Sequence, residues 1–161
     1  MSPMLFTLAH LAILAYATVG GVFLAFSDFI MRALSVISGH GGAEAMQAIN
    51  RAVFRWVFMT FFLGLAAVSL ALIVYAVLEL TGLTATLVGA AGLVYLIGCF
   101  GVTVAFNVPM NEALARMDPS QEATHAYWTG IYLPRWTFWN TIRTITCGVA
   151  AALLLLGLTS V

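Results

Sequence analysis

The stretch TATLVGAAGLVYLIGCFGVTVAF, residues 84–106, contains neither a charged residue nor a proline. A helix that crosses a bilayer needs about 20 predominantly apolar residues, so this stretch predicts a membrane span, and three other segments share its character. The four expected spans cover residues 4–26, 54–78, 84–106 and 139–158. They predict an all-α fold, an integral membrane four-helix bundle that forms a single transmembrane domain over residues 1–161.

The composition predicts that lipid surrounds most of the chain. Only 7% of the residues are charged and 63% are hydrophobic, whereas soluble domains carry roughly a quarter charged residues. The formal net charge is zero and no basic run exists, so we expect no nucleic-acid binding. Membrane lipid and a hydrophobic small molecule are the expected partners, and both a monomer and a homo-oligomer stay open.

The arginines predict how the spans are oriented. Two long connections, residues 27–53 and 107–138, lie on the same side of the membrane because an even number of spans separates them. All six basic residues are arginines in or beside these connections, and basic loops stay in the cytoplasm. We therefore expect a multi-pass protein of the cell inner membrane, with both termini outside.

The first connection contains the segment GGAEAMQAINRAVF, residues 41–54. Met46, Ile49 and Val53 share one face of a helix over this segment, and polar residues lie mainly on the other face. This pattern is typical of a short amphipathic helix that lies in the membrane interface. We expect such an interfacial helix as the one addition to the four spans.

Polar side chains gather at the side of the membrane that carries the long connections. Asn107 and Asn111 are four residues apart and share a face if the helix continues past the kink expected at Pro109. Arg143 lies about one turn inside the last apolar run, where facing lipid is costly, so we expect it to pair with Glu112 or Asp28 inside the bundle.

These residues predict a polar pocket at the cytoplasmic face of the bundle. An aromatic belt, or interhelical hydrogen bonds that only lock the helices together, would explain many of the same residues, and both interpretations stay open. We expect catalytic roles for Glu112, Asn140 and Arg143, and substrate contacts from Asn107, Asn111, Arg135, Trp136, Trp139, Asp28 and Asn50.

The residues that often bind metals are scattered. The three histidines lie at two opposite membrane faces in the expected topology, which is not the arrangement of a metal site. Cys99 and Cys147 both lie inside apolar runs and are expected as small buried side chains rather than as a structural disulfide. We expect no metal and no cofactor.

Four blocks of the sequence resemble one known family. They are FNVPMNEAL (106–114), RWTFWNTIRT (135–144), SDFIMRAL (27–34) and AMQAINRAVF (45–54). They resemble the anthrone oxygenase-like family of four-helix membrane proteins, most of whose bacterial members carry only a domain-of-unknown-function label. The resemblance covers nearly the whole chain. It implies the fold already expected from the spans and, for members with an assigned activity, oxidation of anthrones to anthraquinones with dioxygen.

The resemblance implies a cofactor-independent oxygenase that acts on an anthrone-like or other aromatic substrate. Glu112, Asp28 and His125 are the candidate bases for the acidic methylene proton, and Arg143 or an asparagine would stabilise the resulting anion. The alternative is a non-enzymatic membrane protein that binds a quinone-like ligand or serves as an accessory subunit. Transport is disfavoured because the spans carry no charged residue at mid-membrane.

Overall fold

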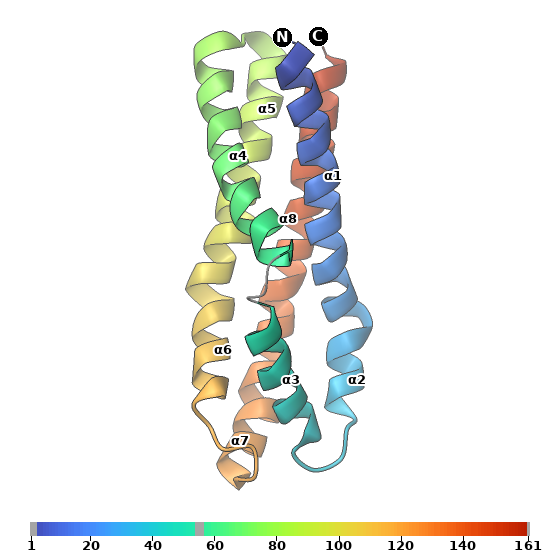
Figure 1. Cartoon of the computed structure of the whole chain (residues 1–161), viewed down its shortest axis with the longest axis vertical. Helices are drawn as coiled ribbons and strands as arrows, with labels where there is room; N and C mark the ends of the chain where they lie inside the picture. The colour runs from blue at the N-terminus through green and yellow to red at the C-terminus, as the bar shows by residue number, and fades with distance from the viewer. Residues whose placement is uncertain (1–2, 54–56, 161) are drawn as a thin grey trace.

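The computed structural model describes residues 3–53 and 57–160, and every regular element within them is helical (Figure 1). The α-helices are α1 (Pro3–Ala25), α2 (Met31–Ser35), α3 (Gly41–Ala52), α4 (Val57–Glu79), α5 (Gly82–Val94), α6 (Val108–Ala115), α7 (Glu122–Tyr127) and α8 (Leu133–Thr159). Four π-helical segments join them: η1 (Phe26–Ile30), η2 (Tyr95–Gly101), η3 (Thr103–Asn107) and η4 (Trp128–Tyr132). The predicted all-α four-helix bundle is confirmed.

The elements form four long legs that run side by side. The first leg is α1 with α2, the second α4 with α3, the third α5 with α6, and the fourth α8 with α7. Both termini and the α4–α5 turn lie at one end of the bundle, and the two longer connections lie at the other end (Figure 1). This arrangement agrees with the even number of crossings that the sequence predicts.

Each leg contains a helical stretch that is long and apolar enough to cross a membrane, as in a multi-pass membrane protein. These stretches are Phe6–Ser35, Val57–Glu79, Gly82–Ala115 and Glu122–Thr159. The 23 residues of α4 rise about 35 Å, close to the hydrocarbon core of about 30 Å. The other three stretches are longer, so the bundle continues past the N-terminal end of α4 at Val57. The helices therefore extend past the expected spans at this end, and residues 54–56 lie outside the described part of the chain.

The position expected for the amphipathic helix is wrong. The segment is helical, as predicted, but α3 runs along the bundle axis below α4 rather than flat in the interface (Figure 1). It packs on α2 and α6, and Met46 is 1% exposed. A Cβ atom at Gly42 would collide with the carbonyl oxygen of Leu34 on α2. The apolar face of α3 therefore completes a protein core, which has the same preference for apolar side chains as lipid has.

The bundle has two apolar cores, one in each half. The core nearer the termini includes Tyr16, Tyr95 and Leu154, and the other core includes Met46 and Trp136. Lipid tails are as apolar as the side chains of these helices, so the hydrophobic effect does not drive the helices together. Close packing and interhelical hydrogen bonds must therefore hold the core nearer the termini together. The Tyr16 hydroxyl is 2.6 Å from the Ser69 hydroxyl, and the Tyr95 hydroxyl donates to a carbonyl of α4 over 2.9 Å.

The kink expected at Pro109 takes the form of a wider helical turn. Proline lacks the N–H that would bond the carbonyl four residues earlier. For Pro109 and Pro134 these carbonyls belong to Ala105 and Gly130, which lie in η3 and η4. The freed carbonyls account for two of the four π-helical segments. Such segments occur often at functional sites, and here they carry several residues of the cavity described next.

Candidate functional site

A cavity of about 250 Å³ lies where the two cores meet. Its walls are mostly apolar, and its polar side chains are Asn50, Thr103, Asn111 and Arg143, joined by the indole of Trp136. The other described lining residues are Val22, Phe23, Phe26, Met46, Ile49, Val53, Phe58, Met59, Phe62, Leu63, Phe100, Val104 and Val108. Leu63 and Val104 are also exposed on the outside of the bundle, so the cavity reaches the outer surface.

Arg143 is the one charged side chain among the described lining residues of this cavity. It is 4% exposed, and its Cζ atom lies 4.1 Å from the ring centre of Phe23 and 5.2 Å from that of Trp136. Its Nη2 donates to Asn140 Oδ1 over 2.7 Å, and its Nη1 donates to Thr103 Oγ1 over 3.2 Å. Two aromatic faces and two neutral acceptors therefore surround the charge.

The ion pair expected for Arg143 does not form. Among residues 3–53 and 57–160, the two salt bridges join Asp28 to Arg32 and Glu112 to Arg116. The buried Nε of Arg143 has no hydrogen-bond partner within the described chain. A buried charge is normally paired, so this arginine has unused capacity for an anion.

Asn140 connects the fourth leg to the first. Its Nδ2 donates to the backbone carbonyl of Phe23 over 2.7 Å and to Ser27 Oγ over 2.6 Å. Its Oδ1 accepts the bond from Arg143, and the side chain is fully buried. Both amide hydrogens are already used, so Asn140 has no donor left for a ligand. Its geometry is that of a residue that positions Arg143 and holds α8 against α1.

A second network sets the orientation of the Asn111 amide. The Tyr132 hydroxyl donates to Asn111 Oδ1 over 2.7 Å, and Trp136 Nε1 donates to the same oxygen over 2.8 Å. Asn50 Nδ2 donates to the Tyr132 oxygen over 3.2 Å. Because an indole nitrogen can only donate, the amide oxygen of Asn111 must face Trp136. The NH₂ group of Asn111 then remains as the donor for a ligand in the cavity that this residue lines.

Asn107 is fully buried beside the cavity but is not among its lining residues. Its Nδ2 donates to the carbonyl of Trp136 over 3.3 Å, and its Oδ1 has no hydrogen-bond partner within the described chain. The predicted common face of Asn107 and Asn111 is confirmed, since both contact the fourth leg. The role of Asn107 here is to join η3 to α8.

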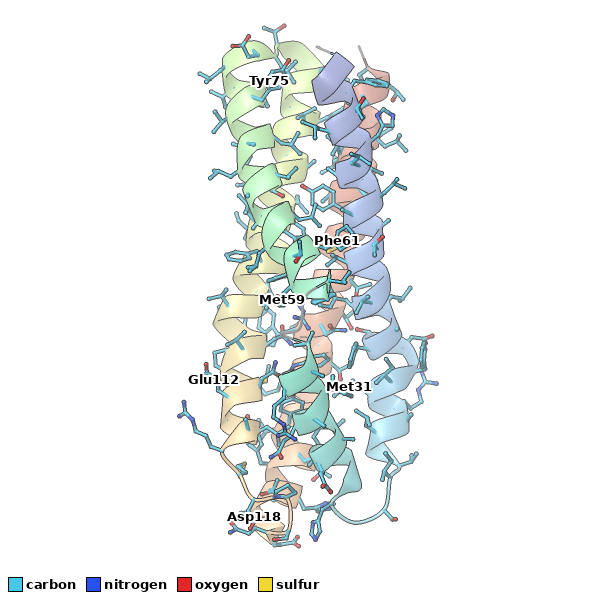
Figure 2. All side chains as sticks on the ribbon, in the orientation of Figure 1. Met31, Met59, Phe61, Tyr75, Glu112 and Asp118 are labelled. Atoms are coloured by element: carbon cyan, nitrogen blue, oxygen red, sulfur yellow. The ribbon has the colours of Figure 1, made fainter. Side chains whose placement is uncertain are left out.

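Six of the ten expected site residues do not line the cavity, and besides Asn107 and Asn140 these are Glu112, Asp28, Arg135 and Trp139. Glu112 and Asp28 keep 61% and 67% of their side chains exposed and pair with arginines on their own helices. Figure 2 shows Glu112 on the outer side of α6. Arg135 is exposed, and Trp139 stacks on Phe106 with ring centres 3.7 Å apart, away from the cavity lining.

Three residues of the site were not expected from the sequence, and two of them, Thr103 and Phe23, line the cavity. Thr103 and Phe23 lie inside apolar runs, where nothing in the pattern separates them from other core residues. Tyr132 lies in the aromatic-rich block before the last span, for which an aromatic belt was one of the open interpretations. Its spacing of four residues from Trp136 was a usable signal, because it places both rings on one helix face. Within the described chain, no group of three His, Cys, Asp or Glu side chains could hold a metal ion.

Comparison with known proteins identifies a family. The model of the anthrone oxygenase family matches residues 51–153, which span α4 to most of α8 and include Asn111, Trp136 and Arg143. Asn50 and Phe23 lie outside the matched region. No curated protein and no solved structure matches the chain.

Proposed function

The chain belongs to the anthrone oxygenase family, and from this premise we propose that its cavity binds a hydroxylated anthrone-like ketone as the enolate and oxidises it with dioxygen. The observation that carries the proposal is the buried Arg143, whose Nε lacks an acceptor within the described chain. An unpaired buried cation is unfavourable. An enolate oxygen in the cavity supplies the missing negative charge when the substrate ionises.

The proposed reaction balances without an external reductant. Loss of one methylene proton to water gives the enolate, and its oxygen accepts hydrogen bonds from Arg143 as an oxyanion does. Dioxygen forms a bond to the former methylene carbon. The peroxide anion takes up the first proton. The second proton then leaves that carbon, the O–O bond breaks, and the hydroxide released combines with the second proton. One oxygen atom becomes the new ketone and the other becomes water.

The rest of the cavity suits a flat apolar ligand. Phe58, Phe62 and Phe100 line it together with aliphatic side chains, and such walls bind aromatic rings by burial and offset stacking. The NH₂ group of Asn111 offers a second donor for a hydroxyl beside the ketone. A ring system with two neighbouring oxygens at one edge therefore matches the donors better than a plain hydrocarbon does.

A binding protein without turnover is the second candidate. None of the described lining residues is an aspartate, a glutamate or a histidine, so the cavity supplies no ordinary general base. The same donors and rings would hold a quinone-like ligand. A binder and an enzyme differ in one respect, because only the enzyme consumes dioxygen when the ligand is an anthrone.

Dioxygen uptake with a hydroxylated anthrone tests the proposal. The purified chain in detergent should exceed spontaneous autoxidation, with a chelator present in both samples, and Arg143→Met should abolish the excess. Arg135→Met is the matched control, because it removes an exposed arginine from the same helix. Ligand binding without excess uptake would favour the binding protein, and neither binding nor uptake would refute both roles for the cavity.

We also propose that the end of the bundle with the long connections faces the cytoplasm, with both termini outside the inner membrane. The support is the distribution of Arg32, Arg51, Arg116 and Arg135, which all lie on elements or connections of that half. Basic loops are retained on the cytoplasmic side. A reporter fused to the C-terminus should be active only in the periplasm, and a cytoplasmic signal would reverse the orientation.

A further inference from the structure

The only two cysteines of the chain touch each other. Cys99 lies on η2 and Cys147 on α8, separated by 48 residues, and their sulfur atoms are 3.4 Å apart. Both side chains are fully buried. A buried residue contacts roughly 6–12 others, so two cysteines placed at random in 161 residues would meet in fewer than about one arrangement in ten. Contact between the two cysteines is therefore uncommon for residues that serve only as separate apolar side chains of the core.

The helix backbones approach closely at the same level. A Cβ atom at Gly98 would collide with the side chain of Thr146, and these residues directly precede the two cysteines. On the other side, a Cβ atom at Gly20 would lie 3.0 Å from Cys147 Cβ. A disulfide needs its two Cα atoms within about 7 Å, and close approach of two helices is what provides this.

We propose that Cys99 and Cys147 form a redox-active dithiol, which hydrogen peroxide converts into a disulfide between η2 and α8. One sulfur attacks a peroxide oxygen, the O–O bond breaks, and a sulfenic acid and one water result. The second sulfur displaces the hydroxyl group, the S–S bond forms, and a second water leaves. The two thiols lose two hydrogens and two electrons, and the peroxide accepts both.

The dithiol is connected to the cavity by a short chain of hydrogen bonds. Thr103 Oγ1 donates to the carbonyl of Cys99 over 2.8 Å and accepts from Arg143 Nη1 over 3.2 Å. Cys147 lies one helical turn after Arg143 on α8. A disulfide fixes the spacing of η2 and α8 beside this chain, so it restrains the position of the cavity's charged group.

Counting the thiols of the full chain tests the proposal without any substrate. A failure of the redox proposal can therefore be distinguished from a failure of the proposed oxygenase. The purified protein is treated with hydrogen peroxide in detergent, unfolded, and alkylated with a maleimide. We expect two labelled thiols before treatment, none after treatment, and two again once dithiothreitol has reduced the sample. The intact mass of the oxidised chain should be lower by two hydrogen atoms.

Two single variants provide the matched controls. Cys99→Ser and Cys147→Ala each leave one buried thiol without a partner, so neither variant should lose two hydrogen atoms after the same treatment. Each should show one labelled thiol once dithiothreitol has reduced the sample, because a lone sulfenic acid is reversible. Two labelled thiols in the treated native chain would overturn the proposal. So would a product that gains oxygen and resists dithiothreitol, because it would mean separate oxidation of each sulfur.

Discussion

The guanidinium carbon of Arg143 lies 4.1 Å from the ring centre of Phe23, so the buried charge of α8 rests on an aromatic face of α1. Cation–π attraction is worth about 2 kcal/mol or more when the pair is desolvated. Unlike a carboxylate, a ring does not neutralise the charge and accepts no strong hydrogen bond. The contact therefore holds the arginine in place and leaves its charge available to an anion.

Replacing Arg143 with methionine should separate stability from activity. The free energy of unfolding should change by less than about 1 kcal/mol, because relief of an unpaired buried charge offsets the lost contact with Phe23 and the lost hydrogen bonds to Asn140 and Thr103. Dioxygen uptake above autoxidation should fall at least about 100-fold, as when an oxyanion donor is removed. Thermal unfolding and an oxygen electrode measure the two effects, and unchanged uptake would remove Arg143 from the reaction.

Asn140→Ala should destabilise the bundle. The variant loses both donors to the first leg and takes away the acceptor of Arg143. We expect a loss of about 1–3 kcal/mol, typical of buried polar groups left unsatisfied, seen as a lower unfolding midpoint. Ser27→Ala removes only one of the acceptors and should cost less. Ser27→Ala also removes the hydrogen bond from Thr141 Oγ1. Equal effects of the two variants would mean that the bonds of Asn140 to the Phe23 carbonyl and to Arg143 add no more than this one bond does.

Glu112→Gln should leave dioxygen uptake unchanged and alter stability by less than about 0.5 kcal/mol. Its pair with Arg116 is exposed, with nitrogen and oxygen 3.5 Å apart, and such pairs contribute little. This outcome would set aside the general base expected from the sequence. A loss of turnover with ligand binding intact would instead restore Glu112 to that role and require a rearranged α6.

Gly98→Ala should weaken the contact between η2 and α8. The new methyl group collides with Thr146, and overpacking of this kind typically costs about 1–3 kcal/mol. Gly148→Ala is the matched control, because a Cβ atom there meets nothing within 4 Å, and it should be neutral or slightly stabilising. The unfolding midpoints of the two variants measure this difference in stability. Equal midpoints would show that the close approach of η2 and α8 does not contribute to the stability of the bundle.

The turn between α6 and α7 should loosen in acid. The backbone N–H and the hydroxyl of Ser120 donate to Asp118 Oδ1 over 3.0 and 2.8 Å, and these bonds hold the pKa of Asp118 below its ordinary value of 3.8. A lowered pKa stabilises the folded turn above that value, and the contribution is lost as the pH falls through the folded pKa.

Hydrogen-exchange protection of the Ser120 amide measures this loosening. Protection should be constant above about pH 5 and fall only below the ordinary pKa of 3.8, since the bonds from Ser120 keep the carboxylate ionised to a lower pH. Figure 2 places Asp118 at the tip of the bundle, far from the α4–α5 turn, so the change should stay local. Asp118→Asn keeps an acceptor oxygen but does not titrate, so its protection should not depend on pH in this range.

Much of the fold follows from the sequence because spans are set by composition alone. The inward direction of Asn107, Asn111 and Arg143 was also predictable, since polar side chains in such helices avoid lipid and follow helical spacing. The position of α3 was not predictable. Its apolar face suits a membrane surface and a protein core equally, and only the other three legs, which extend past α4, decide between them.

The expected role of Glu112 illustrates a different limit. Neighbouring residues of an α-helix point about 100° apart, so once Asn111 faces the fourth leg, Glu112 must face elsewhere. The sequence contained that signal, but proximity along the chain was taken for proximity in space. The hydrogen-bonding role of Tyr132 was hidden for another reason, because an interfacial tyrosine and a buried one look alike in a single sequence.

Different legs of the bundle supply most of the polar and most of the apolar lining residues of the cavity. Its polar lining residues are Trp136 and Arg143 on the fourth leg, Thr103 and Asn111 on the third, and Asn50 on the second. Most of its apolar lining residues, such as Val22 and Leu63, come from the first and second legs. Substitutions on the apolar side would change the size and outline of the space without touching any hydrogen bond of the polar strip. Such an arrangement would let the outline of the cavity change by small steps, because most of its polar groups and most of its apolar wall lie on different legs.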